Sequence, residues 1–433
     1  MALRREAWFG SYLFVGLAQN GLAPILLPLA SKGGAASGLS YAAFALTGLT
    51  APILGSWADR TGRHRDLLVW GCLAAAACFL VMGLVSAGLP YIALAGGAGL
   101  GVTAATTAGN VLVIQGIAQR RWDERVADLQ RIVSAGQVLG LLLAGGLAAS
   151  HMRLAFFFAA VALLVAAALA KVLAPRSSVQ EHAAKPQPLV GGEAGIPGPR
   201  HNEHHMGFGQ LCAFLGVINR RLARFLIVWL IAFTAMNGVA VLFPVVMTRQ
   251  YAMPPILPAL AYAVGMGASL LLYRRVSVLT GRFGAGRILT LGLAVRLVLL
   301  ACLAVFGLYH ALWAGIGVLV AFGIVQMVWP LLGVSANALS VELVPAARGE
   351  SVGLFNAATA VASSVGSAVG GVIFGFFGFS ALSAVAFVAV GVGLWLSVTW
   401  FGGATHATGN GAVANAAYQA TSPDAARRGI RHQ

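Results

Sequence analysis

Residues 55–65 read Gly-Ser-Trp-Ala-Asp-Arg-Thr-Gly-Arg-His-Arg, a short charged stretch between two long apolar segments. These residue types suit a tight turn between two helices. Gly55 lets a neighbouring helix approach closely, and Gly62 permits the positive φ angle that such a turn requires. Asp59 can accept hydrogen bonds from the start of a neighbouring helix or pair with an arginine. The alternative is a solvated charge cluster that only sets the orientation of the chain.

The segments on either side belong to a series of long apolar runs. Of the 433 residues, 59% are hydrophobic and 9% are charged, whereas soluble domains average about 25% charged residues. A run of about 20 apolar residues crosses the hydrocarbon core of a bilayer as a helix, and these runs are too long for barrel strands. The sequence therefore predicts twelve membrane-spanning helices, at 8–30, 38–57, 67–87, 91–117, 128–150, 153–174, 223–247, 256–278, 286–308, 312–341, 350–373 and 380–402.

The basic residues predict the orientation of these helices. Nearly all of the 28 Lys and Arg residues fall in alternate connections and in the two termini. Only Lys32, Arg153 and Arg249 fall on the other side, and Arg296 alone lies inside a span. Because short cytoplasmic loops are enriched in Lys and Arg, we expect both termini to lie in the cytoplasm. The same distribution accounts for the net charge of +16 without a nucleic-acid partner.

Two features divide the chain into halves. Residues 175–222 are rich in Pro, Gly and polar residues, which is typical of a flexible linker, and 207–222 have the pattern of a helix that lies on the membrane surface. The first and seventh spans also share a motif, Ala-Gln-Asn-Gly-Leu-Ala at 18–23 and Ala-Met-Asn-Gly-Val-Ala at 235–240. The sequence thus predicts a six-helix bundle at 1–174, the linker at 175–222, a second six-helix bundle at 223–402 and a disordered tail at 403–433.

In this setting, residues 55–65 resemble the G-x-x-x-D-R-x-G-R-[RK] loop signature of the major facilitator superfamily, found between the second and third spans. A degenerate copy at 280–287 follows the eighth span, with Gly281 in the place of the aspartate. The resemblance implies an all-α membrane protein of two six-helix bundles related by a parallel pseudo-repeat. It also implies a latch that holds the cytoplasmic side shut in the outward-facing state, formed by Gly55, Asp59, Arg60, Gly62, Arg63 and Arg65.

Two other signatures of that family are incomplete. In the fourth span, Ala95 stands where proton-coupled members often carry an arginine. The fifth span reads Gly-Leu-Leu-Leu-Ala-Gly at 140–145, without the proline that is common in antiporters. Small residues here, and at Gly366 and Gly370 of the eleventh span, still favour close helix packing. These departures argue against a typical drug/proton antiporter.

The resemblance implies a central cavity lined mainly by spans 1, 4, 7 and 10. Polar side chains in the middle of the spans are the candidates for solute contact: Asn20, Gln19, Thr103, Thr106, Asn110, Asn237, Gln326 and Trp329, with Gln137, Tyr262, Asn356 and Thr359 in second rank. Gln19 and Asn20 point about 100° apart on an α-helix, so both cannot face one narrow site. Trp329-Pro330 predicts a kink. The alternative is that these side chains hydrogen-bond between helices and only hold the bundle together.

Charged residues inside the predicted spans are scarce. All 12 Asp and Glu residues fall in cytoplasmic connections, at span ends or in tails. Intramembrane carboxylates are the usual proton relays and cation sites, so we expect no proton or sodium coupling of the usual kind. Arg296 has two interpretations. It is either an anion site or a side chain that packs between helices or extends to the surface.

The sequence thus predicts a secondary transporter that moves a small polar or amphipathic, neutral solute across the cell inner (cytoplasmic) membrane by alternating access, with efflux favoured over uptake. The alternative is a non-transporting relative, either a membrane receptor or an assembly factor for a membrane complex. We expect no enzyme activity and no cofactor, because no nucleophile–base pair or metal cluster lies at a consistent depth. His201, His204 and His205 lie in the predicted linker with no fourth metal ligand. The expected partners are the solute and the lipid bilayer, without nucleic acid, and the expected state is a monomer.

Overall fold

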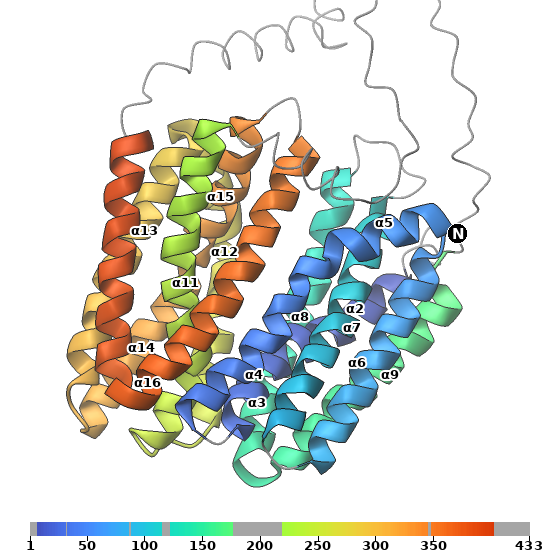
Figure 1. Cartoon of the computed structure of the whole chain (residues 1–433), viewed down its shortest axis with the longest axis horizontal. Helices are drawn as coiled ribbons and strands as arrows, with labels where there is room; N and C mark the ends of the chain where they lie inside the picture. The colour runs from blue at the N-terminus through green and yellow to red at the C-terminus, as the bar shows by residue number, and fades with distance from the viewer. Residues whose placement is uncertain are drawn as a thin grey trace, which may run out of the picture.

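The chain, seen in a computed structural model, is described at residues 7–31, 33–85, 88–114, 122–175, 219–344 and 348–401. Every regular element within these ranges is a helix, as predicted. Figure 1 shows the helices as two neighbouring groups, one coloured blue to teal and the other green to red. The predicted linker at 175–222, with its surface helix at 207–222, lies almost wholly outside the described residues, and so does the predicted tail at 403–433.

The first group contains six membrane-length runs. Two of them are built from several shorter helical pieces, and the other four are single helices. In chain order the elements are η1 (Ala7–Phe9), α2 (Gly10–Gly16), η2 (Leu17–Leu22) and α3 (Ala23–Ala30), then α4 (Gly34–Leu46), η3 (Thr47–Thr50) and α5 (Ala51–Thr61), then α6 (His64–Leu84), α7 (Leu89–Ile114), α8 (Trp122–Ser150) and α9 (Met152–Leu173).

The second group follows the same plan. Its elements are α11 (Arg220–Arg249), α12 (Ile256–Phe283), α13 (Ala285–Gly307), α14 (Leu312–Met327), α15 (Trp329–Leu343) and α16 (Arg348–Phe401). With its 54 residues, α16 would be far longer than a bilayer is thick. It is interrupted at Gly378, whose φ of 80° and ψ of −175° are not helical. Eleven apolar segments in the described residues are long enough to span a membrane, and the division of the last one gives the twelve spans predicted.

Each group has its own buried core. One cluster of buried side chains is built from residues of the first group, including Trp8, Tyr12 and Phe79, with Ala259 and Ala263 of α12 packed against it. The other cluster comes from the second group. Large apolar side chains on the outer surface are widely exposed, with Phe376 at 79% and Leu271 at 78%. A lipid-facing surface has this character, because lipid tails are as apolar as the side chains themselves.

The two groups meet closely near one end of the molecule, which we call the closed end and which holds the α3–α4 connection. Here α4 and α16 approach with glycine on both sides. A Cβ atom added at Gly34 would lie 2.8 Å from the Gly375 Cα atom, and one added at Gly38 would lie 2.8 Å from the Gly371 Cα atom. In Figure 1, α4 and the first part of α16 lie together at this lower end and diverge toward the upper end.

Polar contacts support the closed end. The Arg249 guanidinium donates a hydrogen bond of 3.0 Å to the Ser31 carbonyl, and the Ser364 hydroxyl donates one of 3.0 Å to the Ala42 carbonyl. Both bonds join the first group to the second. The two groups are therefore packed together at the closed end of the molecule. This is the end that the distribution of Lys and Arg predicts to be extracellular.

Contact between α4 and α16 continues as far as the 3-10 turn η3. A Cβ atom added at Gly48 would lie 2.9 Å from the Ala360 Cβ atom. Beyond this point, α5 contacts α6 and α7 of its own group, and α15 contacts α11 to α14 and α16 of its own group. In the described residues, the opposite end, which we call the loop end because it holds Gly62, therefore lacks the tight glycine packing of the closed end.

Candidate functional site

The turn at 61–63 has the backbone that the sequence predicted. Gly62 ends α5 in the left-handed region, with φ 66° and ψ 15°, and α6 begins two residues later. Gly284 occupies the corresponding place between α12 and α13 and also has a positive φ, of 88°. The degenerate second copy of the loop signature thus keeps the glycine that shapes the turn, although it lacks the aspartate.

The other residues of the predicted latch lie on or beside this turn. Gly55 faces α7, where an added Cβ atom would lie 3.3 Å from the Thr107 Cγ2 atom. Arg60 and Arg63 are exposed, and Arg65 is half-buried. Asp59 lies in α5, and its side chain is outside the described part of the structure. The turn thus places three arginines at the loop end.

Gln19 and Asn20 lie in a stretch of π-helix, η2, which the sequence analysis did not predict. The Ala23 N–H bonds to the Ala18 carbonyl, five residues back. The physical reason is Pro24, which has no N–H to donate to the Asn20 carbonyl and so breaks the regular α-helical pattern. Single π-helical turns occur frequently at functional sites. Both side chains are half-buried, and the 100° separation expected for an α-helix does not apply to them.

Glycines bring the first span against the fifth. A Cβ atom added at Gly21 would lie 2.5 Å from the Gly140 Cα atom, and one added at Gly140 would lie 2.8 Å from the Gly21 Cα atom. In the second group, a Cβ atom added at Gly370 would lie 2.8 Å from the Gly238 Cα atom. The sequence repeat therefore corresponds to a repeated helix contact, next to Asn20 in one half and next to Asn237 in the other.

Asn237 is engaged between helices. Its side-chain NH₂ group donates hydrogen bonds to the Ser363 carbonyl at 2.8 Å and to the Ser367 hydroxyl at 2.9 Å, both in α16. No partner for the Asn20 side chain occurs among the described residues. The structure thus favours the helix-packing interpretation for Asn237, whereas the Asn20 amide makes no such contact in the described residues.

The remaining candidates of the first group lie along α7. Thr106 is half-buried, and its hydroxyl donates to the Val102 and Thr103 carbonyls one turn earlier. The Thr103 hydroxyl lies 3.3 Å from that of Thr47. Asn110 is exposed, and so is Asn356 of α16, whereas Gln137 of α8 is half-buried.

A polar and aromatic cluster lies in the second group, at the junction of α14 and α15. The kink predicted at Trp329-Pro330 is present, because Val328 is not helical and separates the two helices. Gln326 is buried on one side of the break, and Trp329 is half-buried on the other. Tyr262 of α12 packs against Phe322 of α14, with ring centroids 5.0 Å apart, and a Cβ atom added at Gly265 of α12 would lie 2.8 Å from the Gln326 Cβ atom. The structure therefore brings Gln326, Trp329 and Tyr262 into one region of the second group.

Two aromatic residues extend this cluster along α11, and the sequence analysis did not single them out. Phe233 contacts Trp329, with 5.7 Å between ring centroids, and stacks on Trp229 at 5.1 Å. The Trp229 indole N–H donates to the Thr359 hydroxyl at 2.9 Å, so this second-rank candidate serves helix contact. The spacing of Trp229 and Phe233, four residues apart on one helix face, is the signal that could have indicated a shared surface.

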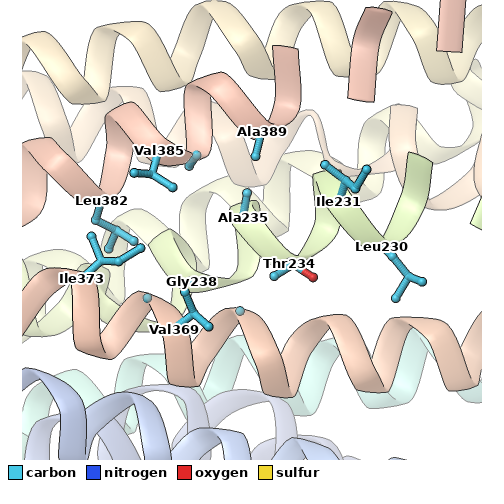
Figure 2. A pocket seen from close by; sticks show the side chains of 13 residues that line it. Leu230, Ile231, Thr234, Ala235, Gly238, Val369, Ile373, Leu382, Val385 and Ala389 are labelled. Carbon is cyan, nitrogen blue, oxygen red and sulfur yellow. The ribbon is translucent and has the colours of Figure 1, made fainter. Parts of the chain in front are cut away.

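Two hollows in the described surface lie elsewhere. One, of about 380 Å³, lies between α11 and the two parts of α16, and Thr234 is its one polar side chain among otherwise apolar ones such as Leu230 and Val385 (Figure 2). It contains none of the predicted solute-contact residues. The other, of about 520 Å³, lies between α6 and α9 and is lined by Arg65 of the predicted latch, with Trp70 and Lys171.

We compared the sequence and the fold with known proteins. A family model described as "Major Facilitator Superfamily" matches residues 8–334. No curated protein sequence matches the chain significantly.

Solved structures share the fold at low sequence identity. The nucleoside transporter NupG superposes with a TM-score of 0.72 at 13% identity, over 93% of this chain and 99% of that one. A bacterial homologue of the iron transporter ferroportin gives a TM-score of 0.66 at 15% identity, over 92% of this chain and 98% of that one. A bacterial homologue of the human lysosomal transporter Spinster gives 0.62 at 13% identity, over 92% and 94%. Chains of different cargo thus share this arrangement of helices.

Proposed function

Because this chain belongs to the Major Facilitator Superfamily and is a multi-pass membrane protein, we propose that it moves a small solute across the cytoplasmic membrane by alternating access. The family is one of transporters rather than enzymes. In alternating access, two halves rock about a fixed site, so that the site opens to one side of the membrane at a time.

The observation that carries the proposal is the unequal contact between the two halves. Gly34 and Gly38 pack against Gly375 and Gly371 at the closed end, whereas α5 and α15 at the loop end contact their own halves. In a carrier whose two halves rock, each open state has the halves in contact at one end and apart at the other. The arrangement seen here is of this kind. With the loop end in the cytoplasm, as the Lys and Arg distribution favours, this is the inward-open state.

The latch proposal follows from the same geometry. In the outward-open state the loop end has to close, and the turn at Gly62 places Arg60, Arg63 and Arg65 there. We propose that Asp59 and these arginines, positioned by Gly55 and Gly62, hold that end shut. The corresponding second turn keeps Gly284 but has Gly281 in place of the aspartate, so the latch is asymmetric.

Solute contact in the first half is assigned to Asn20, with Gln19 beside it, at the π-helical turn. Thr106 and Asn110 of α7 are further candidates, and the second half supplies Gln326 and Trp329. Efflux is the favoured direction. The two bundles at 1–174 and 223–402 are proposed to move as the rigid halves, and the linker at 175–222 joins them in a monomer.

Reconstitution tests this proposal. The full chain is placed in liposomes, and the flux of a panel of small polar and amphipathic solutes is measured in both directions, with empty liposomes and with Asp59→Asn as controls. Flux of at least one solute that saturates with concentration and falls in the variant is the expected result. If no solute moves, and the protein instead co-purifies with a partner in fixed ratio, the chain is a receptor or assembly factor.

A further inference from the structure

Arg296 is a cation buried in the middle of the membrane-spanning region. It lies halfway along α13 and is 3% exposed. Its Nε atom and one terminal nitrogen are buried without a hydrogen-bond partner in the described structure. Its side chain therefore packs between helices, and does not extend to the membrane surface.

Packing alone is a poor reason to keep an arginine here. A charged side chain at the centre of a bilayer costs about 2.5–3.5 kcal/mol on insertion scales, and each buried donor without a partner costs roughly 1–3 kcal/mol more. A leucine would fill comparable space without either cost. A buried cation with donors that the described residues leave unused is thus a candidate site for an anion.

The helices around Arg296 offer no carboxylate to neutralise it. No Asp or Glu occurs in the sequences of α12, α13 and α14, or in residues 379–401, the part of α16 that packs against α13. Glu350 lies in the other part of α16, at its start. The one acidic residue of α15 is Glu342, thirteen residues beyond Trp329 and so roughly 20 Å along the helix. The compensating negative charge therefore has to come from outside these helices.

The groups that surround Arg296 suit an anion with a flat apolar body. Its guanidinium carbon lies 5.8 Å from the centroid of the Trp329 ring. Trp329 and its neighbour Phe233 keep part of their surface exposed, so the aromatic surface is accessible beside the charge. Tyr262 and Gln326 add a hydroxyl and an amide within the same cluster.

From this arrangement we infer that the second half binds an organic anion, an aromatic carboxylate in type, with its carboxylate on Arg296 and its ring against Trp329. Arginine suits this role because its planar fork of donors matches a carboxylate with two parallel hydrogen bonds. The inference rests on the proposed transport function and gives it a substrate class. It replaces the neutral solute that the sequence favoured.

The test is binding of matched probes to the full chain in lipid nanodiscs, measured by calorimetry. Benzoate, 1-naphthoate and indole-3-acetate are compared with their primary amides, which have the same shape without the charge. Carboxylates are expected to bind about 10- to 100-fold more tightly than the amides, as loss of a hydrogen bond to a charged group predicts. Arg296→Gln should lower carboxylate affinity to the level of the amides.

Two further variants sharpen the result. Arg224→Gln is the matched control, because Arg224 also lies over a tryptophan, at 5.6 Å from the Trp400 ring centroid, but is exposed at the start of α11; it should leave binding unchanged. Arg296→Lys keeps the charge and loses the fork, and should show intermediate affinity. It also supplies the test if Arg296→Gln does not fold.

Three outcomes would overturn the inference: no carboxylate binds, amides bind as tightly as carboxylates, or the folded Arg296 variants bind like the wild type. Flux measurements separate this from failure of the proposed function. Neutral solutes that are transported while no carboxylate binds would leave a carrier without this anion site. Carboxylate binding without any flux would support the anion site but contradict the proposed transport function.

Discussion

Two asparagines hold equivalent places in the two halves, and their surroundings differ. Asn237 donates two hydrogen bonds to α16, whereas Asn20 lies on a π-helical turn and has no partner among the described residues. Equivalent positions in the sequence therefore do not have equivalent hydrogen bonding. The repeat has kept the residue type while the helix around Asn20 has changed its winding.

Replacement by leucine, which is similar in size, should separate the two roles. Asn237→Leu removes two interhelical hydrogen bonds worth about 0.6 kcal/mol each in membranes, so stability should fall by roughly 1 kcal/mol. Asn20→Leu should change stability by less than about 0.5 kcal/mol and should weaken solute binding. Thermal unfolding in detergent, with binding measured on the same samples, checks both. The reverse pattern would assign the solute to Asn237.

The proposed role of Asp59 in the latch can be tested by removing the charge of its side chain. Asp59→Asn keeps the shape of the side chain and removes its charge, so charge-assisted bonds to arginine should weaken by about half. We expect expression and folding as in the wild type, with slower turnover in liposomes. Arg153→Gln, a charge change at the closed end of the molecule, where α9 begins, serves as the control. Full turnover in the Asp59 variant would exclude a latch that depends on the carboxylate.

For single residues, the sequence predicted the backbone conformation better than it predicted the side-chain hydrogen-bond partners. The left-handed φ of Gly62 followed from the need for a turn between two spans, because glycine adopts that conformation at no steric cost. The bonds of Asn237 did not follow, since the sequence does not say which face of α11 meets α16. For Arg296 likewise, extension to the membrane surface was excluded only when its burial against Trp329 was known.

Helix breaks in the two halves both lie next to a proline, but only one of them was predicted. The break before Trp329-Pro330 followed from the proline at the second position of the new helix. The π-helical turn at 17–22 has a cause that is equally local, Pro24, yet proline also occurs in regular membrane helices, such as Pro244 within α11. A proline leaves the carbonyl four residues earlier without its usual helical hydrogen bond. Tertiary packing decides how the helix accommodates that carbonyl.

Glycine contacts between spans provide a stability test on one helix. Gly140→Ala places a methyl group 2.8 Å from the Gly21 Cα atom, so the two backbones must separate. Such overpacking typically costs about 1–3 kcal/mol. Gly146→Ala, also in α8, has nothing within 4 Å and should be neutral or stabilising by up to about 1 kcal/mol. Chemical unfolding of both variants should therefore shift in different directions or by clearly different amounts.

For the whole molecule, the fold could be predicted from the sequence, but which end of the two bundles is closed could not. Twelve apolar segments, the repeated Asn-Gly pairs and the loop at 55–65 led to two helical bundles, and the helices, their breaks and the family match agree. Which end is packed did not follow, because glycines occur at many positions along the spans. The closed end became visible only when Gly34 and Gly38 were found against Gly375 and Gly371.

Gly38→Leu should shift the equilibrium between the two states. The added side chain cannot fit against Gly371, so the closed end should open and the alternative state should gain population. Spin labels at Leu89 and Leu312, exposed positions that begin α7 and α14 at the closed end, report the separation of the halves. The distance distribution should move to longer values than in the wild type.

Gly146→Leu, which has open space around it, is the control for the general effect of a larger side chain. Its distance distribution should match that of the wild type. An unchanged distribution in folded Gly38→Leu would mean that the glycine contact does not set the state of the molecule.

The anion site inferred at Arg296 predicts an electrical signature for the proposed transport cycle. An organic anion carried without a co-transported ion moves one negative charge across the bilayer in each turnover. At a potential of 100 mV, negative inside, the field contributes about 2.3 kcal/mol per charge, which corresponds to a concentration ratio of roughly 50 in favour of the outside. We expect currents from proteoliposomes on a solid-supported membrane, and a cell would export such an anion at no cost beyond its resting potential.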